Sequence, residues 1–357
     1  MEVNLAYYRE THLHAESGQE RVMQALIDLV GTVRYLDPCL PRRMPYRLID
    51  RLAPPLGEHR RMSFYEPASL PLEYAVMRRL VTAPGQVVHM LQGEPHFNYT
   101  AWLRHWPRRR GALVVTFQQP PERFEEVWRF RNKRARLAAI DHIVVTSTPQ
   151  LEYFRELVGE RVTKVPLGAN RWAFMPPRLE RPARHEVRCL AVGSHLRDPG
   201  LLRRAIELVT QRDDNVSFTV ISSREFLAEL GSPPRTTRLE GLSDEVLMAA
   251  YHDADLFVHP VAHAAGNTAL LEAMSCGLPV VAPDVGGVRD YVDESCAEIV
   301  APGDPRAMAD AILRLAGDRA RRLGMGESAE RRSAARDWQH VADELVAVYA
   351  KALARRS

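Results

Sequence analysis

Short apolar runs alternate along this chain with longer stretches in which apolar residues recur every three or four positions. The first pattern is typical of strands covered on both faces, and the second of amphipathic helices. Strands are predicted at 3–8, 87–91, 112–117, 142–147, 162–166, 187–192, 216–221, 256–258 and 278–282. Helices are predicted between them, among others at 71–81, 97–106, 122–137, 201–209, 243–252 and 338–353. Strands that alternate with helices imply an α/β fold built on doubly wound parallel sheets.

The stretch after the apolar run 256–258 carries the most chemistry. A loop of small residues leads into a helix that Asn267 or Thr268 can cap. Backbone N–H groups at such a helix start, from Gly266 to Thr268, can bind a phosphate. Glu272 lies one turn inside the helix, where its carboxylate can accept hydrogen bonds from two sugar hydroxyls. The alternative is a solvated glutamate beside an ordinary loop, because most loops of this kind bind no phosphate.

The string LLEAMSCGLPVVAPDVGG, at 270–287, resembles the donor-binding segment of the GT4 family of GT-B glycosyltransferases. That family usually has two glutamates eight residues apart, of which the second holds the ribose of the nucleotide and the first lies near the sugar. Glu272 matches the second, whereas Ala264 occupies the place of the first. The resemblance implies a GT-B fold, with two Rossmann-like domains that face each other across a cleft, and a nucleoside diphosphate sugar as donor.

Two more segments resemble donor-site motifs of the family. The residues 17–21 loosely fit a Gly-rich loop, in which Gly18 would let the backbone approach the donor phosphates. The residues 239–242 resemble a segment whose backbone lies beside the base. The resemblance therefore implies that Gly241 and Leu242 contact the nucleotide.

The loop 193–200 corresponds to a family loop in which an arginine and a lysine clamp the pyrophosphate. Ser194 stands at the usual arginine, and the loop contains no lysine. Arg197 is its one strong cation, and a guanidinium can grip a phosphate bidentately. We therefore predict that Arg197 binds the phosphate; the alternative is a surface arginine.

The segment LGANRWAF, at 167–174, is similar to the family's interdomain segment. We accordingly predict an acceptor-side domain at 1–170 and a donor-binding domain at 171–337. In GT-B proteins the closing helix crosses back onto the first domain, so about 338–357 is assigned to that domain. The resemblance is close over about 140–355 and weak over 1–140.

In the first domain the strand 112–117 ends at Gln118, where relatives commonly carry a histidine that faces the sugar. A glutamine cannot act as a general base, but its amide can hydrogen-bond a sugar hydroxyl. His89 and His96 flank the end of the preceding strand, at the edge where open α/β sheets bind ligands. The predicted catalytic residues are Arg197, Gln118 and His89, and His96 is predicted to bind substrate.

Composition is that of a globular protein, with 357 residues, 46% hydrophobic and 26% charged. No apolar run approaches the ~20 residues that cross a membrane, and the N-terminus lacks the features of a signal peptide, so a cytoplasmic location is predicted. The four scattered cysteines are expected to be free thiols; they are Cys39, Cys189, Cys276 and Cys296. No acidic pair stands where a divalent metal would be expected, so the prediction is metal independence and no cofactor besides the donor.

Charge is uneven, since residues 1–170 carry a net +6 and the remainder −3. Trp102, Trp106 and Arg108 to Arg110 form a basic, aromatic cluster in the first half. Such a cluster predicts peripheral contact with the inner face of a membrane, or with an anionic lipid. The alternative is a packed helix followed by a solvated, charged turn. No nucleic-acid partner is predicted.

Together these features and the resemblance predict an enzyme that moves a sugar from a nucleoside diphosphate sugar to a glycan, lipid-linked or small-molecule acceptor. The resemblance implies that it is a retaining enzyme of the hexosyltransferase type. The runner-up is a non-catalytic nucleotide-sugar-binding partner or activator of another transferase. Ala264, Gln118 and Ser194 motivate it, because each replaces a residue that the family often uses. A sugar-nucleotide epimerase of similar fold is a third, weaker interpretation.

Overall fold

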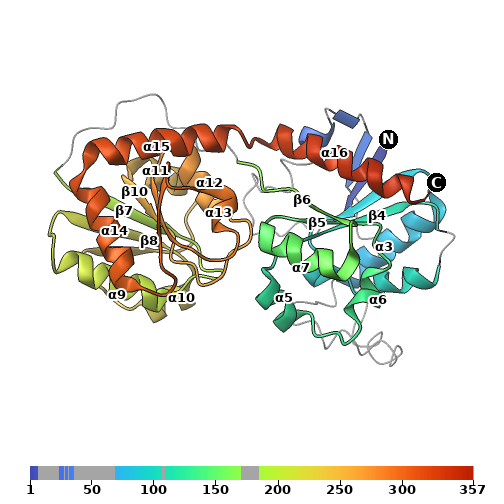
Figure 1. Cartoon of the computed structure of the whole chain (residues 1–357), viewed down its shortest axis with the longest axis horizontal. Helices are drawn as coiled ribbons and strands as arrows, with labels where there is room; N and C mark the ends of the chain where they lie inside the picture. The colour runs from blue at the N-terminus through green and yellow to red at the C-terminus, as the bar shows by residue number, and fades with distance from the viewer. Residues whose placement is uncertain are drawn as a thin grey trace. The chain divides into compact units, whose positions relative to one another are not determined.

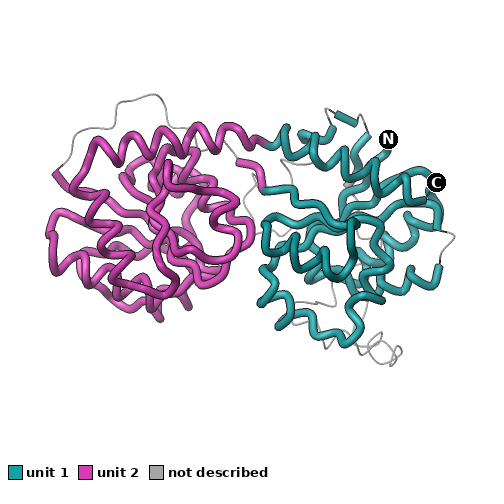
Figure 2. Tube along the Cα trace, in the orientation of Figure 1, with its two compact units in different colours: residues 1–166, 338–357 teal, residues 167–337 magenta. Residues whose placement is uncertain are grey.

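The computed structural model divides the chain into two compact units, one of residues 1–166 with 338–357 and the other of residues 167–337 (Figure 2). The sequence had placed the change of domain at 170/171. The residues that the structure describes are 1–6, 24–27, 29–30, 32–35, 69–106, 109–169 and 185–356. Each unit is a parallel sheet with helices on both faces (Figure 1). The predicted α/β class is therefore confirmed.

Unit 1 contains a six-stranded sheet in the order β2-β1-β3-β4-β5-β6, and every neighbouring pair is parallel. Its strands are β1 (Glu2–Ala6), β2 (Thr32–Tyr35), β3 (Gln86–Met90), β4 (Ala112–Phe117), β5 (His142–Val145) and β6 (Val162–Lys164). Every residue of β4 is buried, because helices cover both of its faces. This burial explains why β4 reads as a continuous apolar run rather than as an alternating one.

The helices of unit 1 lie on opposite faces of its sheet. One face is covered by α3 (Ser69–Thr82), α4 (Gly93–His96), the 3₁₀ helix η2 (Tyr99–His105), α5 (Pro121–Val127), α6 (Lys133–Leu137) and α7 (Thr148–Val158). On the other face, α16 (Trp338–Ala354) packs with Val341, Leu345 and Val348 against β3 and β4. The last helix of the chain therefore completes the core of the first unit.

Two predicted helices of unit 1 are wrong in detail. The single helix expected at 122–137 is broken into α5 and α6, because Trp128 and Phe130 turn into an aromatic cluster around Phe117 and Phe124. The helix expected at 97–106 is instead a short α4 followed by η2. There the buried carboxylate of Glu73 accepts hydrogen bonds from the amides of Asn98 and Thr100, at 3.0 and 2.6 Å.

Unit 2 has a second parallel sheet in the order β12-β11-β10-β7-β8-β9. Its strands are β7 (Val187–Val192), β8 (Val216–Ile221), β9 (Thr236–Leu239), β10 (Leu256–Val258), β11 (Val280–Pro283) and β12 (Ala297–Val300). The sequence did not predict β9 or β12. Both are short edge strands, and β9 is not buried at any position, so neither has a clear apolar signal.

The helices of unit 2 likewise cover both faces of its sheet. They are α9 (Pro199–Thr210), α10 (Arg224–Leu230), α11 (Asp244–Asp253), α12 (Thr268–Ser275), α13 (Val288–Tyr291), α14 (Pro305–Gly317) and α15 (Arg319–Ala334). One face packs against α9, α10 and α14, and the other against α11, α12 and α13 (Figure 1). No helix in the described part of the chain is long and apolar enough to cross a bilayer.

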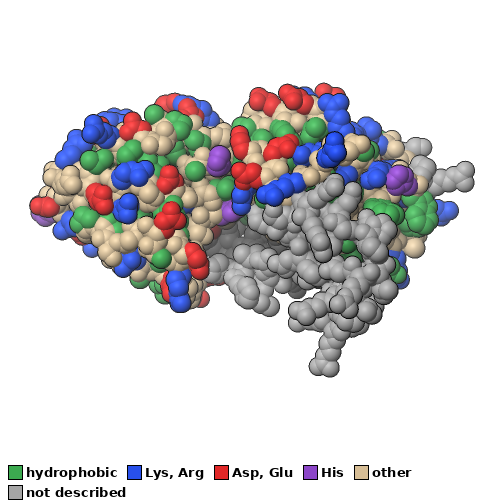
Figure 3. All heavy atoms as spheres, turned by 90° about the horizontal axis from the view of Figure 1, so that it is seen from below, with side chains coloured by type: hydrophobic (Ala, Val, Ile, Leu, Met, Phe, Trp, Pro, Cys, Tyr) green, Lys and Arg blue, Asp and Glu red, His purple; other side chains and the backbone are tan. Residues whose placement is uncertain are grey.

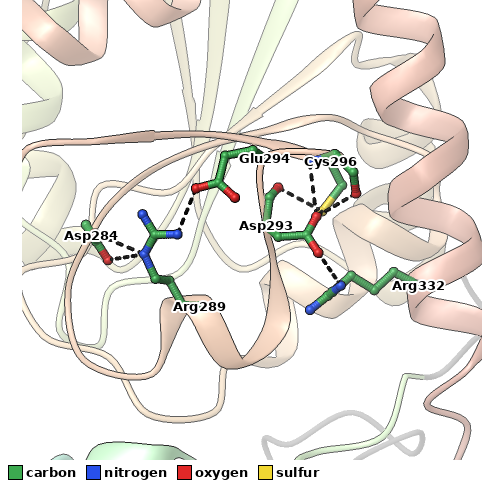
Figure 4. A network of polar contacts seen from close by, with 7 residues as sticks. Asp284, Arg289, Asp293, Glu294, Cys296 and Arg332 are labelled. Atoms are coloured by element: carbon green, nitrogen blue, oxygen red, sulfur yellow. Dashed lines mark hydrogen bonds and ion pairs between the residues drawn. The ribbon is translucent and has the colours of Figure 1, made fainter.

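Helix α15 anchors the segment that follows α13. Arg332 on α15 donates to the carbonyl of Tyr291 at 2.7 Å and pairs with Asp293 (Figure 4). The Asp293 carboxylate also accepts from the amide of Ser295. Gly326 allows the same helix to approach α12 closely, because a Cβ there would lie 2.3 Å from the carbonyl oxygen of Gly277. Helix α15 thus contacts both the segment after α13 and the end of α12.

Candidate functional site

The loops after β7 and β10 meet at the carboxyl edge of the unit 2 sheet, because the two strands are parallel neighbours. Backbone bonds join the loops: the amide of Ala262 donates to Leu196 O at 2.9 Å, and that of Asp198 to Pro260 O at 2.7 Å. The second loop ends at Asn267, whose Oδ1 caps α12 by accepting from the amide of Leu270 at 3.2 Å. The start of α12 therefore lies beside the loop that carries Arg197.

Arg197 is held in this edge by three hydrogen bonds. Its guanidinium donates to Val192 O at 3.0 Å, to His195 O at 2.7 Å and to Asn267 Oδ1 at 3.1 Å. Gly193 has φ +92° and lies against the guanidinium, since a Cβ on Gly193 would be 3.1 Å from Nη2 of Arg197. Burial lowers the pKa of Arg197 to about 10, which leaves it a cation at neutral pH. The predicted phosphate-binding arginine is thus an ordered, largely desolvated charge and not a surface side chain.

Glu272 on α12 is oriented by Tyr251 on α11. The phenol of Tyr251 is completely buried and donates to Glu272 Oε2 at 2.8 Å. Burial, and then the charge of Glu272, raise the pKa of Tyr251 well above its usual value, so the phenol remains a donor. The charges of Arg197 and Glu272 also attract each other, as the rise that Glu272 imposes on the pKa of Arg197 shows. A cation and a carboxylate therefore stand together beside the start of α12.

His259 is a member of this group that sequence reasoning did not assign. It is the first residue after β10, is fully buried, and stacks on Phe257 with ring centroids 5.7 Å apart. Among the described residues neither ring nitrogen has a hydrogen-bond partner, and the same holds for Nε of Arg197. Burial, and then the charge of Arg197, hold the pKa of His259 well below its usual range. The sequence signal that could have identified His259 is its position as a polar residue directly after a buried strand. Tyr251, on the helix before that strand, was not assigned either.

Small residues in the second loop are required by packing. A Cβ on Gly266 would lie 2.7 Å from the side chain of Leu167 and 2.8 Å from the hydroxyl of Tyr291. A Cβ on Gly286 would lie 2.2 Å from Ala264 O, which also accepts the amide of Gly287 at 2.8 Å. Ala264 itself is buried in the apolar core of unit 2. The place of the family's first glutamate is therefore occupied here by a core residue.

The remaining donor-side predictions lie at the far edge of the sheet or outside the described residues. Gly241 follows the edge strand β9, is exposed and has φ +63°, and Leu242 beside it is partly buried. Glu240 pairs with Arg224 at 3.0 Å and does not join the group around Arg197. Thr268 is exposed at the first position of α12. Gly18 lies outside the described residues.

Comparison with known proteins identifies the unit that carries this group. Residues 186–318 match the model of the family named glycosyl transferases group 1. Unit 2 therefore matches the group 1 glycosyl transferase family over most of its length. The chain is 29% identical to the D-inositol 3-phosphate glycosyltransferase of Nocardia farcinica over 257 residues. The match covers 64% of this chain and 56% of that protein. The GDP-mannose-dependent alpha-mannosyltransferase of Mycolicibacterium smegmatis is 40% identical over 118 residues, 32% of this chain and 31% of that protein. The chain thus spans little more than half the length of the first of these relatives.

Solved structures show that the fold extends over both units. The sucrose-phosphate synthase of Thermosynechococcus elongatus superposes with a TM-score of 0.66 at 18% identity, over 99% of each chain. HepE of Anabaena, in complex with UDP, gives 0.66 at 13% identity, over 97% of this chain and 98% of that one. These neighbours show that the chain has the predicted GT-B fold.

In unit 1, His89 is a core residue and not a candidate catalytic group. The side chain is 1% exposed, and both ring nitrogens are occupied, Nδ1 by Tyr349 Oη at 2.8 Å and Nε2 by Thr116 Oγ1 at 2.7 Å. Burial lowers its pKa to about 3. The prediction for His89 is therefore wrong: the side chain links α16 to the sheet.

The other two acceptor-side predictions also have internal contacts. His96 is buried, its Nδ1 lies 2.8 Å from Ser69 Oγ, and burial lowers its pKa to about 4. The amide of Gln118 donates to Leu91 O at 3.1 Å. Glu94, which sequence reasoning passed over, accepts the backbone amides of Gln118 and Gln119 at 2.5 and 2.6 Å. Burial raises the pKa of Glu94 to about 7.

The predicted arginine run does not form a single exposed cluster, and the described cysteines are free. Arg109 is buried and pairs with Asp141 at 2.6 Å, so it is part of the structure of unit 1. Arg108 lies outside the described residues, as does Cys39. The other three cysteines are free and buried. In the described part of the chain, no three His, Cys, Asp or Glu side chains are grouped so as to hold a metal ion.

Proposed function

We propose that this protein is a group 1 glycosyltransferase that moves a hexosyl group, with retention of configuration, from a nucleoside diphosphate sugar to a glycan, lipid-linked or small-molecule acceptor. One observation carries the proposal: partly buried Arg197 and the Tyr251–Glu272 pair converge beside the start of α12, at the carboxyl edge of the sheet. Carboxyl ends of parallel strands are where such folds bind ligands. The protein would use no metal and no cofactor besides the donor.

Arg197 would supply the charge that the reaction needs. The bond that breaks joins the anomeric carbon to a phosphate oxygen, and negative charge develops on the departing diphosphate. A desolvated guanidinium stabilises such charge more strongly than an exposed one does, because the effective dielectric constant around it is lower. The backbone N–H groups at the start of α12 add the positive end of the helix dipole, which also attracts an anion. His259, close to Arg197 and without a partner among the described residues, is a further candidate donor to the phosphate.

Glu272 would bind the nucleoside part of the donor. Tyr251 donates to one oxygen of the Glu272 carboxylate, Oε2, and so fixes the orientation of the other oxygen. An ionised carboxylate has acceptor capacity for two ribose hydroxyls besides that bond. The names of related proteins support the class of donor, since one is a GDP-mannose-dependent transferase and the HepE structure contains UDP.

Binding and turnover test the proposal in two steps. Thermal melts with a panel of nucleoside diphosphates should show one base that raises the melting temperature, because a ligand that binds only the native state stabilises it. The matching nucleoside diphosphate sugars should then release nucleoside diphosphate in the presence of an acceptor. A melting temperature that no nucleoside diphosphate shifts would overturn the assignment of the site.

The second candidate function is a non-catalytic nucleotide-sugar-binding partner or activator of another glycosyltransferase. Ala264 favours it, because its side chain is buried in the core of unit 2 where the family usually places a glutamate near the sugar. Turnover separates the two functions. Tight nucleotide binding without release of nucleoside diphosphate from any donor sugar would select the non-catalytic role.

A further inference from the structure

Three large aromatic side chains of unit 1 are exposed to solvent. Tyr74 on α3 is 53% exposed, Trp102 on η2 is 48% exposed, and Trp106 directly after η2 is 56% exposed. They are half of the exposed large hydrophobic side chains in the described part of the chain. The two elements are adjacent, because Glu73 on α3 binds the amides of Asn98 and Thr100 at the start of η2. The exposure is thus concentrated on one pair of packed elements.

The exposed charged residues of the described segment from 69 to 111 are of one sign. Arg78 on α3, Arg104 on η2 and Arg110 are exposed. The described residues from 69 to 111 contain two carboxylates, Glu73 and Glu94, and both are buried on backbone amides. No described acidic side chain of this segment therefore offsets the three arginines. We refer to Tyr74, Arg78, Trp102, Arg104, Trp106 and Arg110 as the α3–η2 surface.

Unit 2 differs in this respect. Many of its exposed arginines pair with acidic side chains, as in Arg188–Asp253, Arg212–Asp310 and Arg224–Glu240. The face of unit 2 at the left of Figure 3 accordingly shows basic and acidic side chains interspersed. The combination of exposed aromatics and unopposed arginines distinguishes the α3–η2 surface from that background.

We infer that the α3–η2 surface docks the protein onto a membrane that contains anionic phospholipids. Tryptophan and tyrosine suit the boundary between lipid and water, because one part of each ring system is apolar and the other can bond water. Arginines close to an anionic leaflet add attraction that salt screens. The inference deepens the predicted membrane contact, and it holds whether or not the transferase function does.

Sedimentation with vesicles tests the charge component. The full-length protein should bind vesicles of phosphatidylcholine with about 30% phosphatidylglycerol, bind pure phosphatidylcholine much more weakly, and lose binding as salt rises. Replacing Arg78, Arg104 and Arg110 with serine should weaken binding to the anionic vesicles by about a hundredfold, since each arginine near the surface contributes about fivefold. The matched control replaces Arg203, Arg319 and Arg331 of unit 2 with serine, removes the same charge, and should change binding by less than about threefold.

A second variant tests the aromatic component independently. Trp102→Ser with Trp106→Ser should weaken binding by about tenfold, because two indole rings no longer enter the interface. It should also reduce the blue shift of tryptophan fluorescence that vesicles cause. Val246→Ser, at a position 50% exposed on unit 2, is the control and should keep wild-type binding. All replaced side chains are exposed, so unchanged melting temperatures should confirm that the variants fold.

Several outcomes would overturn the inference. They are equal binding to neutral and anionic vesicles, no binding at low salt, and equal loss in the unit 2 control. A dimer that Trp102→Ser with Trp106→Ser converts to a monomer would show that a second copy covers the surface instead. Nucleoside diphosphate affinity, measured on the same variants, should be unchanged. Its absence in the wild type would count against the proposed function and not against membrane docking.

Discussion

The carboxyl edges of the two sheets have similar inventories of polar residues and use them differently. In unit 1, both nitrogens of His89 are bonded within the core, and the Gln118 amide is bonded to Leu91 O. In unit 2, Arg197 and Glu272 stand together, and His259 and Nε of Arg197 are buried without a hydrogen-bond partner among the described residues. A buried polar atom without a partner costs free energy. Such atoms also occur in unit 1, but at the unit 2 edge they lie beside a desolvated cation at the start of α12, and this combination favours that edge as the binding site.

His89 and Arg197 show two roles that a polar residue near the end of a strand can have. His89 contributes stability, because it joins α16 to β3 and β4 across the interior of unit 1. Arg197 instead brings a desolvated charge to an edge where helix α12 begins, and that arrangement is suited to an anion. His89 lies within a strand and Arg197 in the loop that follows one. Both ring nitrogens of His89 are bonded inside the protein, whereas Nε of Arg197 has no partner among the described residues.

The largest expected effect comes from removing the charge in unit 2. Arg197→Met should weaken nucleoside diphosphate binding by about a hundredfold, because a charge-assisted hydrogen bond is lost. Binding of the free nucleoside should change by less than about twofold. Calorimetry with both ligands measures the difference, and Arg203→Met on α9 is the control. If diphosphate affinity survives within about twofold, another group neutralises the phosphate.

Removing the carboxylate should have the next largest effect. Glu272→Ala should weaken nucleoside diphosphate binding by about 2 kcal/mol, within the range for hydrogen bonds to charged groups. Calorimetry measures it, and Glu327→Ala, at an exposed position on α15, should leave the affinity unchanged. Unaltered affinity in Glu272→Ala would remove that residue from the site.

The unit 1 side of the comparison predicts a pH effect on stability. Since the pKa of His89 is about 3 in the folded protein, the unfolded chain alone binds a proton there as pH falls below about 6.5. His89 alone should therefore cost about 2 kcal/mol of stability between pH 7.5 and pH 5. His89→Gln should lose that part of the acid sensitivity in urea melts. His96 and His142, whose pKa values burial lowers to about 4, should maintain the rest. An unchanged pH dependence in His89→Gln would contradict the core assignment.

The smallest effect on nucleotide binding is expected from removing the hydroxyl of Tyr251. Tyr251→Phe should weaken binding of a nucleoside diphosphate by about fivefold, because the net contribution of one hydrogen bond is about 1 kcal/mol. If the phenol acts by orienting Glu272 toward the ribose, a 2′,3′-dideoxynucleoside diphosphate should bind wild type and variant equally. Equal losses with both ligands would mean that Tyr251 supports packing and does not position the carboxylate.

The sequence was sufficient for the architecture, and it singled out Arg197 and Glu272, which the structure brings to one edge of the unit 2 sheet. Nearly continuous apolar runs predicted the central strands, since helices cover both faces of each, but β9 and β12 have exposed or mixed patterns that a sheet edge permits. Arg197 and Glu272 followed from one loop and one helix. The role of His89 did not, because its partner Tyr349 is 260 residues away on α16. The same limit applies to Arg109, which depends on Asp141.

Peptide-resolved hydrogen exchange with and without a nucleoside diphosphate tests the central comparison most directly. Each peptide reports protection where the ligand orders or covers backbone amides. The expected result, with UDP or GDP as probe, is protection in the peptides that cover 193–198 and 264–275 of unit 2. The peptides that cover 86–96 and 112–120 of unit 1 should exchange as in the free protein. Protection confined to the unit 1 peptides, with unit 2 unchanged, would contradict the assignment of the nucleotide to the edge that carries Arg197 and Glu272.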